Sequence, residues 1–167
     1  MKSLKTLPIT LWTKTLKVLI FILGLPILTL GGFFMFQVTE FAFELWGQML
    51  FLKPIFYTLL VLTAVLFIII LLKVIQVITQ FERHEIFSLR TQTLFTQASI
   101  YTFIVSAIYM LFLPIFYIAA DLDDAPGFVL IGLFFVVLSF ALALLFWVIT
   151  NIIKQAQELA EESKWVV

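Results

Sequence analysis

Four long stretches of the chain contain no Asp, Glu, Lys or Arg, and this feature most limits how the chain can fold. They cover residues 18–38, 54–72, 91–120 and 127–153. A helix rises about 1.5 Å per residue, so each stretch is long enough to cross a hydrocarbon layer of about 30 Å. Within lipid, a spanning segment must satisfy its own backbone hydrogen bonds, which favours helices. The sequence therefore predicts an all-α, integral membrane, four-helix transmembrane bundle.

The composition excludes most other classes of protein. Hydrophobic residues make up 63% of the 167 residues, charged residues make up 12%, and cysteine is absent. A soluble domain is about 45–50% apolar and about 25% charged. These values exclude a soluble enzyme, a disordered chain, a disulfide scaffold and a cysteine-ligated metal site. Because the net charge is zero, we expect no direct binding of nucleic acid.

We expect residues 1–167 to form a single transmembrane domain. Its spans are predicted at about 18–38, 54–76, 94–120 and 127–150, and a helical tail follows at 151–167. The first apolar stretch follows a basic leader, but it is too long for a signal peptide and no small-residue cleavage site follows it. We therefore interpret it as a retained span.

The positions of Lys and Arg predict the orientation. With four spans, the leader, the second loop and the tail lie on one side of the membrane, and this side carries nine of the ten basic residues. Cytoplasmic loops are enriched in Lys and Arg. We therefore expect a multi-pass protein with both termini in the cytoplasm.

The outer loops carry five acidic residues and one lysine. Glu40, Glu44 and Gln48 recur every fourth residue, which predicts a short helix on the outer interface with Trp46 at the headgroup level. Acidic residues before a helix commonly act as caps, and this is the first interpretation of the second outer link. The alternative is an acidic face that attracts cations, formed by Glu40, Glu44, Asp121, Asp123 and Asp124.

The inner loop and the tail are predicted to extend the helices into the cytoplasm. The second helix continues past Lys73, and Ser88 is a suitable N-cap for the third. His84 lies between carboxylates in the loop but lacks the partners of a metal or proton site. The tail favours helix, and either it docks against the inner loop or it presents a partner surface.

The four charge-free stretches contain no acidic or basic side chain, which argues against proton relays, intramembrane proteases and most transporters. We therefore expect no catalytic residue, no metal and no cofactor. Thr102 and Ser106, and likewise a Ser–Ala pair on the fourth span, have the spacing of closely packed membrane helices. Pro26 and Pro114 are predicted to bend their helices, which either opens a cavity or only shapes the packing.

Two segments resemble a known family. They are HEIFSLRTQTL at 84–94 and AQELAEESKWVV at 156–167. They are similar to the inner loop and the C-terminal ending of an uncharacterised bacterial four-span family, domain of unknown function 2975, often encoded beside a small helix-turn-helix regulator. The residues that fit the family pattern are Phe87, Ser88, Leu159, Glu162 and Val167.

Two positions depart from this pattern, because Lys164 stands where the family has Asp and the Asn after Phe-Ser is absent. The resemblance implies the four-span fold and the bacterial plasma membrane. It implies no reaction. Since the matching residues gather on the cytoplasmic side, the candidate partner-binding residues are Phe87, Ser88, Arg90, Leu159 and Glu162.

Three functions follow from these observations. The first is a non-enzymatic sensor, regulator or accessory subunit, whose partners are the lipid bilayer and a cytoplasmic regulator, another membrane protein or a second copy. The second is a small oligomeric transporter or a lipid- or drug-binding membrane protein. An enzyme acting on lipid would have to use Glu82, His84 and Glu85, or Glu40 and Glu44, and no nucleophile lies beside a base there. We therefore predict that the protein is not an enzyme.

Overall fold

The computed structural model describes residues 7–45, 51–82 and 86–165, and it contains four long helices. They are α1 (Leu7–Leu45), α2 (Lys53–Glu82), α3 (Leu89–Leu122) and α4 (Gly127–Trp165). All four are long and apolar enough to cross a membrane, and the described residues contain no strand. The predicted all-α, four-helix transmembrane architecture is confirmed.

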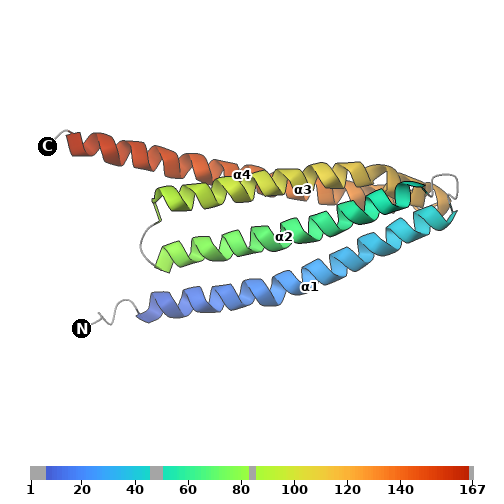
Figure 1. Cartoon of the computed structure of the whole chain (residues 1–167), viewed down its shortest axis with the longest axis horizontal. Helices are drawn as coiled ribbons and strands as arrows, with labels where there is room; N and C mark the ends of the chain where they lie inside the picture. Colours follow the sequence, from blue (N-terminus) through green and yellow to red (C-terminus); the bar gives the residue numbers. More distant parts are fainter. Residues whose placement is uncertain (1–6, 46–50, 83–85, 166–167) are drawn as a thin grey trace.

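The helices run antiparallel along one elongated bundle (Figure 1). The start of α1, the end of α2, the start of α3 and the end of α4 lie at one end, which we call the basic end. The end of α1, the start of α2 and the α3–α4 link lie at the other, which we call the acidic end. α3 contacts every other helix, whereas within the described residues α4 contacts α3 alone. The bundle is therefore built around α3.

Because α3 is central, it contributes more of the buried core than any other helix. The most deeply buried large side chains of the bundle are Phe112 and Phe116, each 1% exposed, and both belong to α3. The faces of the helices that point away from the core remain strongly apolar, with Leu30 and Leu130 about 70% and 68% exposed. Hydrocarbon tails solvate such side chains as well as a protein core does, so these faces suit contact with lipid.

Small and hydroxyl side chains join α3 to α4. Ser99 Oγ donates to the carbonyl of Ala143 at 2.9 Å, and Ser106 Oγ donates to the carbonyl of Val136 at 3.2 Å. Ser99 and Ala143 are fully buried. Interhelical hydrogen bonds of this kind contribute about 0.6 kcal/mol each in membrane proteins. The small-residue spacing noted in the sequence therefore lies at a real helix–helix interface.

The two ends of α3 are defined by different residues. Ser88 is the N-cap, since its side chain accepts a hydrogen bond from the backbone N–H of Thr91 at 3.2 Å. This confirms the predicted cap. Asp123 is the C-cap, where its own N–H donates to the carbonyl of Ala119, and Asp124 adopts φ +49°. Asp tolerates this left-handed conformation better than most residues.

The acidic residues of this link were expected to cap the following helix, and that expectation is wrong. Asp123 and Asp124 instead end α3 and reverse the chain, because only four residues separate α3 from α4. The reversal uses backbone contacts, including Ala125 N–H to the carbonyl of Ala120 at 2.9 Å.

A separate interfacial helix is expected after the first span, but the described part of that segment, residues 39–45, continues α1 instead. The reason is burial: Thr39, Ala42 and Phe43 are 1%, 2% and 4% exposed, so packing against the bundle holds this segment in line with α1. Trp46 and Gln48 lie outside the described residues. Pro26 and Pro114 lie inside α1 and α3, as predicted, and the helices continue through them.

Candidate functional site

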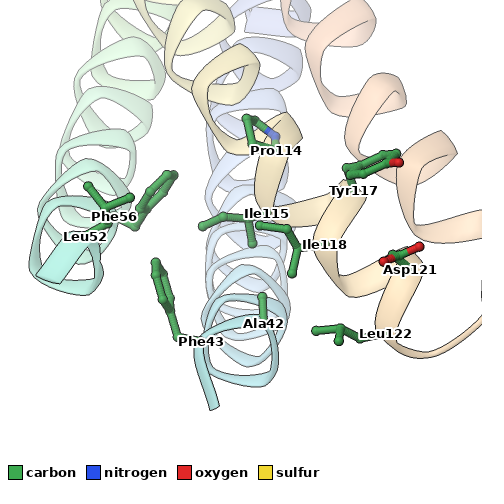
Figure 2. Close-up of a pocket in the computed structure, with 10 residues that line it drawn as sticks. All are labelled: Ala42, Phe43, Leu52, Phe56, Pro114, Ile115, Tyr117, Ile118, Asp121 and Leu122. Atoms are coloured by element: carbon green, nitrogen blue, oxygen red, sulfur yellow. The ribbon is translucent and has the colours of Figure 1, made fainter. Parts of the chain in front are cut away.

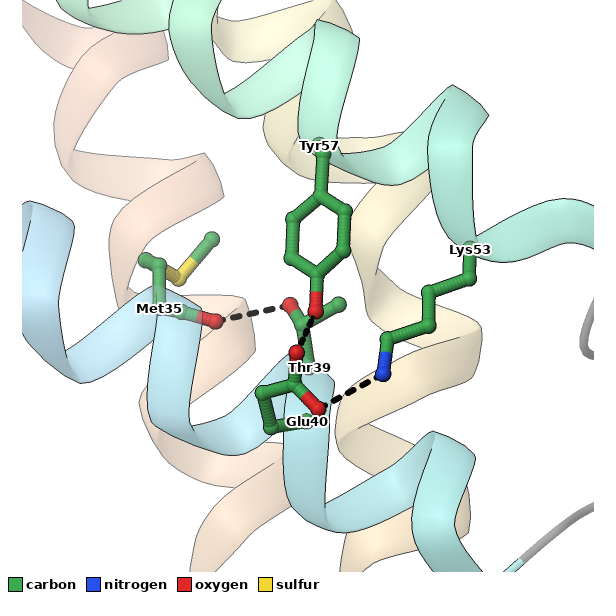
Figure 3. A network of polar contacts seen from close by, with 5 residues as sticks. All are labelled: Met35, Thr39, Glu40, Lys53 and Tyr57. Carbon is green, nitrogen blue, oxygen red and sulfur yellow. Dashed lines mark hydrogen bonds and ion pairs between the residues drawn. The ribbon is translucent and has the colours of Figure 1, made fainter.

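At the acidic end, Glu40 holds α1 to the start of α2. Lys53 Nζ donates to Glu40 Oε2 at 2.7 Å, and the Tyr57 hydroxyl donates to the other carboxylate oxygen (Figure 3). Directly before Glu40, Thr39 donates to the carbonyl of Met35, which lies one turn earlier in α1. The ring of Tyr57 stacks on Phe36, with centroids 5.6 Å apart. These contacts clamp the α1–α2 hairpin.

Glu40 lies beyond the predicted span 18–38, and its carboxylate is stabilised by both donors. The Lys53 ammonium, followed by the Tyr57 hydroxyl, lowers the pKa of Glu40 below its ordinary value of 4.5, and partial burial opposes this shift. A carboxylate that accepts two such bonds stays ionised. Glu40 is therefore committed to Lys53 and is not free to bind an external cation.

The other residues of the predicted acidic face are exposed at this end: Glu44, Asp121, Asp123 and Asp124. Lys53 is the basic residue here, and its ammonium is already paired with Glu40. Among the described residues, no three carboxylate, histidine or cysteine side chains gather in a metal-binding group. The structure thus leaves this end negative, with its carboxylates spread along the surface.

A cavity of about 410 Å³ opens beside these carboxylates. Figure 2 shows Phe43 of α1 and Phe56 of α2 on one side, and Ile115 and Ile118 of α3 on the other. Asp121 belongs to the same lining, on the α3 side, one turn beyond Tyr117. The cavity lies next to Pro114, which also lines it. Its size falls within the range of about 300–1,000 Å³ found for small-molecule sites.

A smaller cavity of about 90 Å³ lies between the helices, nearer the middle of α1. Gly31 and Gly32 form part of its wall, and an added Cβ at either would meet nothing within 4 Å. The ring of Tyr109 closes another side and packs on Phe135, with centroids 5.6 Å apart.

At the basic end, α1 and α2 are joined by an ion pair. Lys17 Nζ lies 2.9 Å from Glu82 Oε2, and about a fifth of each side chain is exposed. Hydrogen bonds from Thr13 and then from Lys17 lower the pKa of Glu82, which lies beyond the predicted span 54–76. Two residues earlier, Gln80 is 3% exposed, and its side-chain oxygen has no hydrogen-bond partner among the residues that the structure describes.

The tail of α4 reaches the α2–α3 link at this same end. Gln157 Nε2 donates to the carbonyl of Phe87 at 3.0 Å. A groove of about 420 Å³ lies beside this bond, between the start of α3 and the end of α4. The predicted contact between the tail and the inner loop is present.

Of the predicted partner-binding residues, Phe87 and Leu159 remain 61% and 66% exposed, and Arg90 and Glu162 are also exposed. Ser88 is the N-cap of α3. The link and the tail are thus brought together, but each residue faces largely outward. His84 lies outside the described residues.

The sequence did not reveal which residue pairs hold the ends of the bundle, although it predicted that the tail and the inner loop could meet. The Glu40–Lys53, Lys17–Glu82 and Gln157–Phe87 pairs each join segments 13 to 70 residues apart. The two ion pairs could have been found from the sequence. In an antiparallel hairpin, the polar residues just beyond the apolar part of one helix lie beside those just beyond the apolar part of the other. Gln157 gave no such signal, since its partner is a backbone carbonyl.

Comparison with known proteins places the chain in one family. A family model described as a protein of unknown function (DUF2975) matches residues 29–167. The chain is 26% identical over 155 residues to the uncharacterized membrane protein YoaS of Bacillus subtilis (strain 168), covering 93% of this chain and 97% of that protein. No solved structure matches. With four apolar helices and a family match over most of its length, the chain belongs to the DUF2975 family of membrane proteins.

Proposed function

We propose that this membrane protein is a non-enzymatic sensor, regulator or accessory subunit that acts through the α2–α3 link and the tail of α4. The observation that carries the proposal is the bond from Gln157 to the carbonyl of Phe87, which joins two exposed segments into one surface. Figure 1 shows α4 extending beyond the first turn of α3, so this surface projects from the bundle.

The chemistry of this surface suits a protein partner. Phe87, Leu89 and Leu159 are 61%, 75% and 66% exposed, and they lie beyond the predicted spans. Exposed apolar residues outside the membrane commonly mark interaction sites. The tail also presents Glu158, Glu161 and Glu162 to solvent, which favours a partner with basic residues beside apolar ones.

We propose that the basic end faces the cytoplasm of a bacterial cell, so that both termini are cytoplasmic. The uneven distribution of Lys and Arg supports this, since nine of the ten lie on that side of the predicted spans. The absence of cysteine makes a direct test simple. In intact cells, a membrane-impermeant maleimide is expected to label Glu44→Cys but not Glu161→Cys, and the reverse pattern would refute this orientation.

The proposal assigns no catalytic role. Within the described residues, two carboxylates accept a hydrogen bond from a hydroxyl group, Glu40 from Tyr57 and Glu82 from Thr13. Each is also paired with a lysine, which holds it ionised and makes it a poor general base. Hydrolytic mechanisms require a nucleophile, a base and a stabilising group within reach of one another.

The partner surface is tested by cross-linking in the native membrane, followed by purification and mass spectrometry. A stoichiometric protein partner is expected, and Phe87→Ala and Leu159→Ala should remove it. Phe33→Ala is the matched control, because Phe33 is 62% exposed on α1 within a predicted span. Recovery that is equal in all three variants, or no partner at all, would refute the proposed function.

The second candidate is a small oligomeric transporter, or a lipid- or drug-binding membrane protein. The observation that favours it is the cavity of about 90 Å³ between the helices, whose wall begins directly after Pro26 at Ile27. A transporter would give substrate-dependent flux in liposomes in an oligomeric preparation. Gly32→Leu should then block the flux, because the new side chain fills open space.

A further inference from the structure

We propose that the cavity at the acidic end is a binding site for a small lipophilic cation, a compact apolar body that carries one positive charge. This site lies at the opposite end of the bundle from the partner surface, so the inference goes beyond the proposed function and does not depend on it. Three observations support it: the size of the cavity, the aromatic residues in its wall and the charge around it.

The shape and lining of the cavity suit an apolar body. Its volume of about 410 Å³ is sufficient for a drug-sized molecule, and Leu52, Ile115 and Ile118 form part of its wall. It lies where α3 passes from Pro114 to its last turn, with α1 and α2 opposite (Figure 2).

The aromatic residues of the lining favour an apolar ligand that carries a positive charge over a neutral one. Phe43 and Phe56 line the cavity with ring centroids 5.8 Å apart, and Tyr117 of α3 also belongs to the lining. The face of an aromatic ring attracts a positive charge, most strongly where the contact is shielded from water. A neutral ligand would gain nothing from this interaction.

The charges at the acidic end also favour a cationic ligand. Asp121 lines the cavity from the last turn of α3, is exposed, and pairs with no basic side chain among the described residues. Asp123 and Asp124 follow directly, while Lys53 is already paired with Glu40. The enrichment of Lys and Arg at the opposite side explains why basic residues are scarce here. It does not explain an apolar, aromatic cavity with a free carboxylate in its lining.

The test uses the full-length protein in nanodiscs of zwitterionic lipid and two probes of matched size and opposite charge. Binding of tetraphenylphosphonium and of tetraphenylborate is measured by equilibrium dialysis against empty nanodiscs of the same lipid. We expect saturable binding of about one tetraphenylphosphonium per protein, and none of tetraphenylborate beyond the empty nanodiscs.

Three variants locate the site. Asp121→Asn should weaken binding of the cation about fivefold, since it removes one partly exposed charge contact. Asp124→Asn removes the same charge from the same end but not from the cavity lining, so it should change affinity by less than about twofold. Leu122→Trp places a bulky side chain at the cavity wall and should abolish saturable binding.

Four outcomes would overturn the proposal. These are no saturable binding of the cation, equal binding of the anion, an Asp121→Asn affinity no lower than that of Asp124→Asn, or full binding by Leu122→Trp. Equal binding of both ions would mean that the cavity accepts any apolar body, such as a lipid chain. Because Asp121 forms no ion pair with the described residues, Asp121→Asn tests the proposal even if Leu122→Trp is destabilised.

Discussion

Gly132 on α4 lies against the ring of Phe116 on α3, and one added methyl group tests how closely these two helices must pack. A Cβ at Gly132 would lie 2.8 Å from two ring carbons of Phe116, closer than real Cβ contacts occur. Phe116 is 1% exposed, so its ring has no free space to enter. The helices must therefore separate, which would also lengthen the hydrogen bond from Ser106 to the carbonyl of Val136.

The expected cost of Gly132→Ala follows from this geometry. Inserting a methyl group into a closely packed site destabilises a protein by about 1–3 kcal/mol. The matched control is Gly31→Ala, where a Cβ would meet nothing within 4 Å. Replacing Gly by Ala inside a helix with free space stabilises it by up to about 1 kcal/mol. The two variants should therefore differ by about 2 kcal/mol or more, although the chemical change is identical.

A third glycine should give a change in stability between those of Gly132→Ala and Gly31→Ala. A Cβ at Gly24 would lie 2.8 Å from Leu71, but the contact is with the tip of a flexible side chain. Gly24→Ala should thus fall between the other two. The assay is reversible unfolding in mixed micelles, with helix content as the signal and the free energy of unfolding as the result. A Gly132→Ala protein as stable as Gly31→Ala would refute the close packing of α3 on α4.

Three further variants probe the contacts between helices. Ser99→Ala should lower the free energy of unfolding by about 0.6 kcal/mol, measured in the same assay, because its interhelical hydrogen bond is lost; an unchanged value would contradict that bond. Hydrogen bonds from Thr13 and from Lys17 lower the pKa of Glu82 in the folded protein, so these contacts stabilise the fold above pH 4.5 and are lost as the pH falls through the folded pKa. Glu82→Gln should therefore show a smaller loss of melting temperature on acidification than the unmodified chain, and an equal loss would argue against the ion pair. Gln157→Ala should speed hydrogen exchange in the tail of α4, whereas the exposed neighbour Gln155→Ala should not; equal exchange in both would mean that the tail does not dock.

The sequence by itself determined the four helices, their approximate limits and the two ends of the bundle. The apolar stretches had to be helical because lipid offers no partner for the backbone, and Ser88 could be recognised as a cap from local chemistry alone. The family resemblance could likewise be recognised from short motifs, and the match over residues 29–167 confirms it. Each of these features depends on neighbouring residues only.

Only the tertiary structure decided which helix faces meet. The helices are apolar around most of their circumference, so no single stripe marks the buried face, and the central place of α3 could not be read from periodicity. For the same reason the continuation of α1 through Thr39 was missed, since burial against other helices keeps that segment helical. The cavity beside Asp121 and the bond from Gln157 to Phe87 depend on residues far apart in the chain, which come together only when the helices pack.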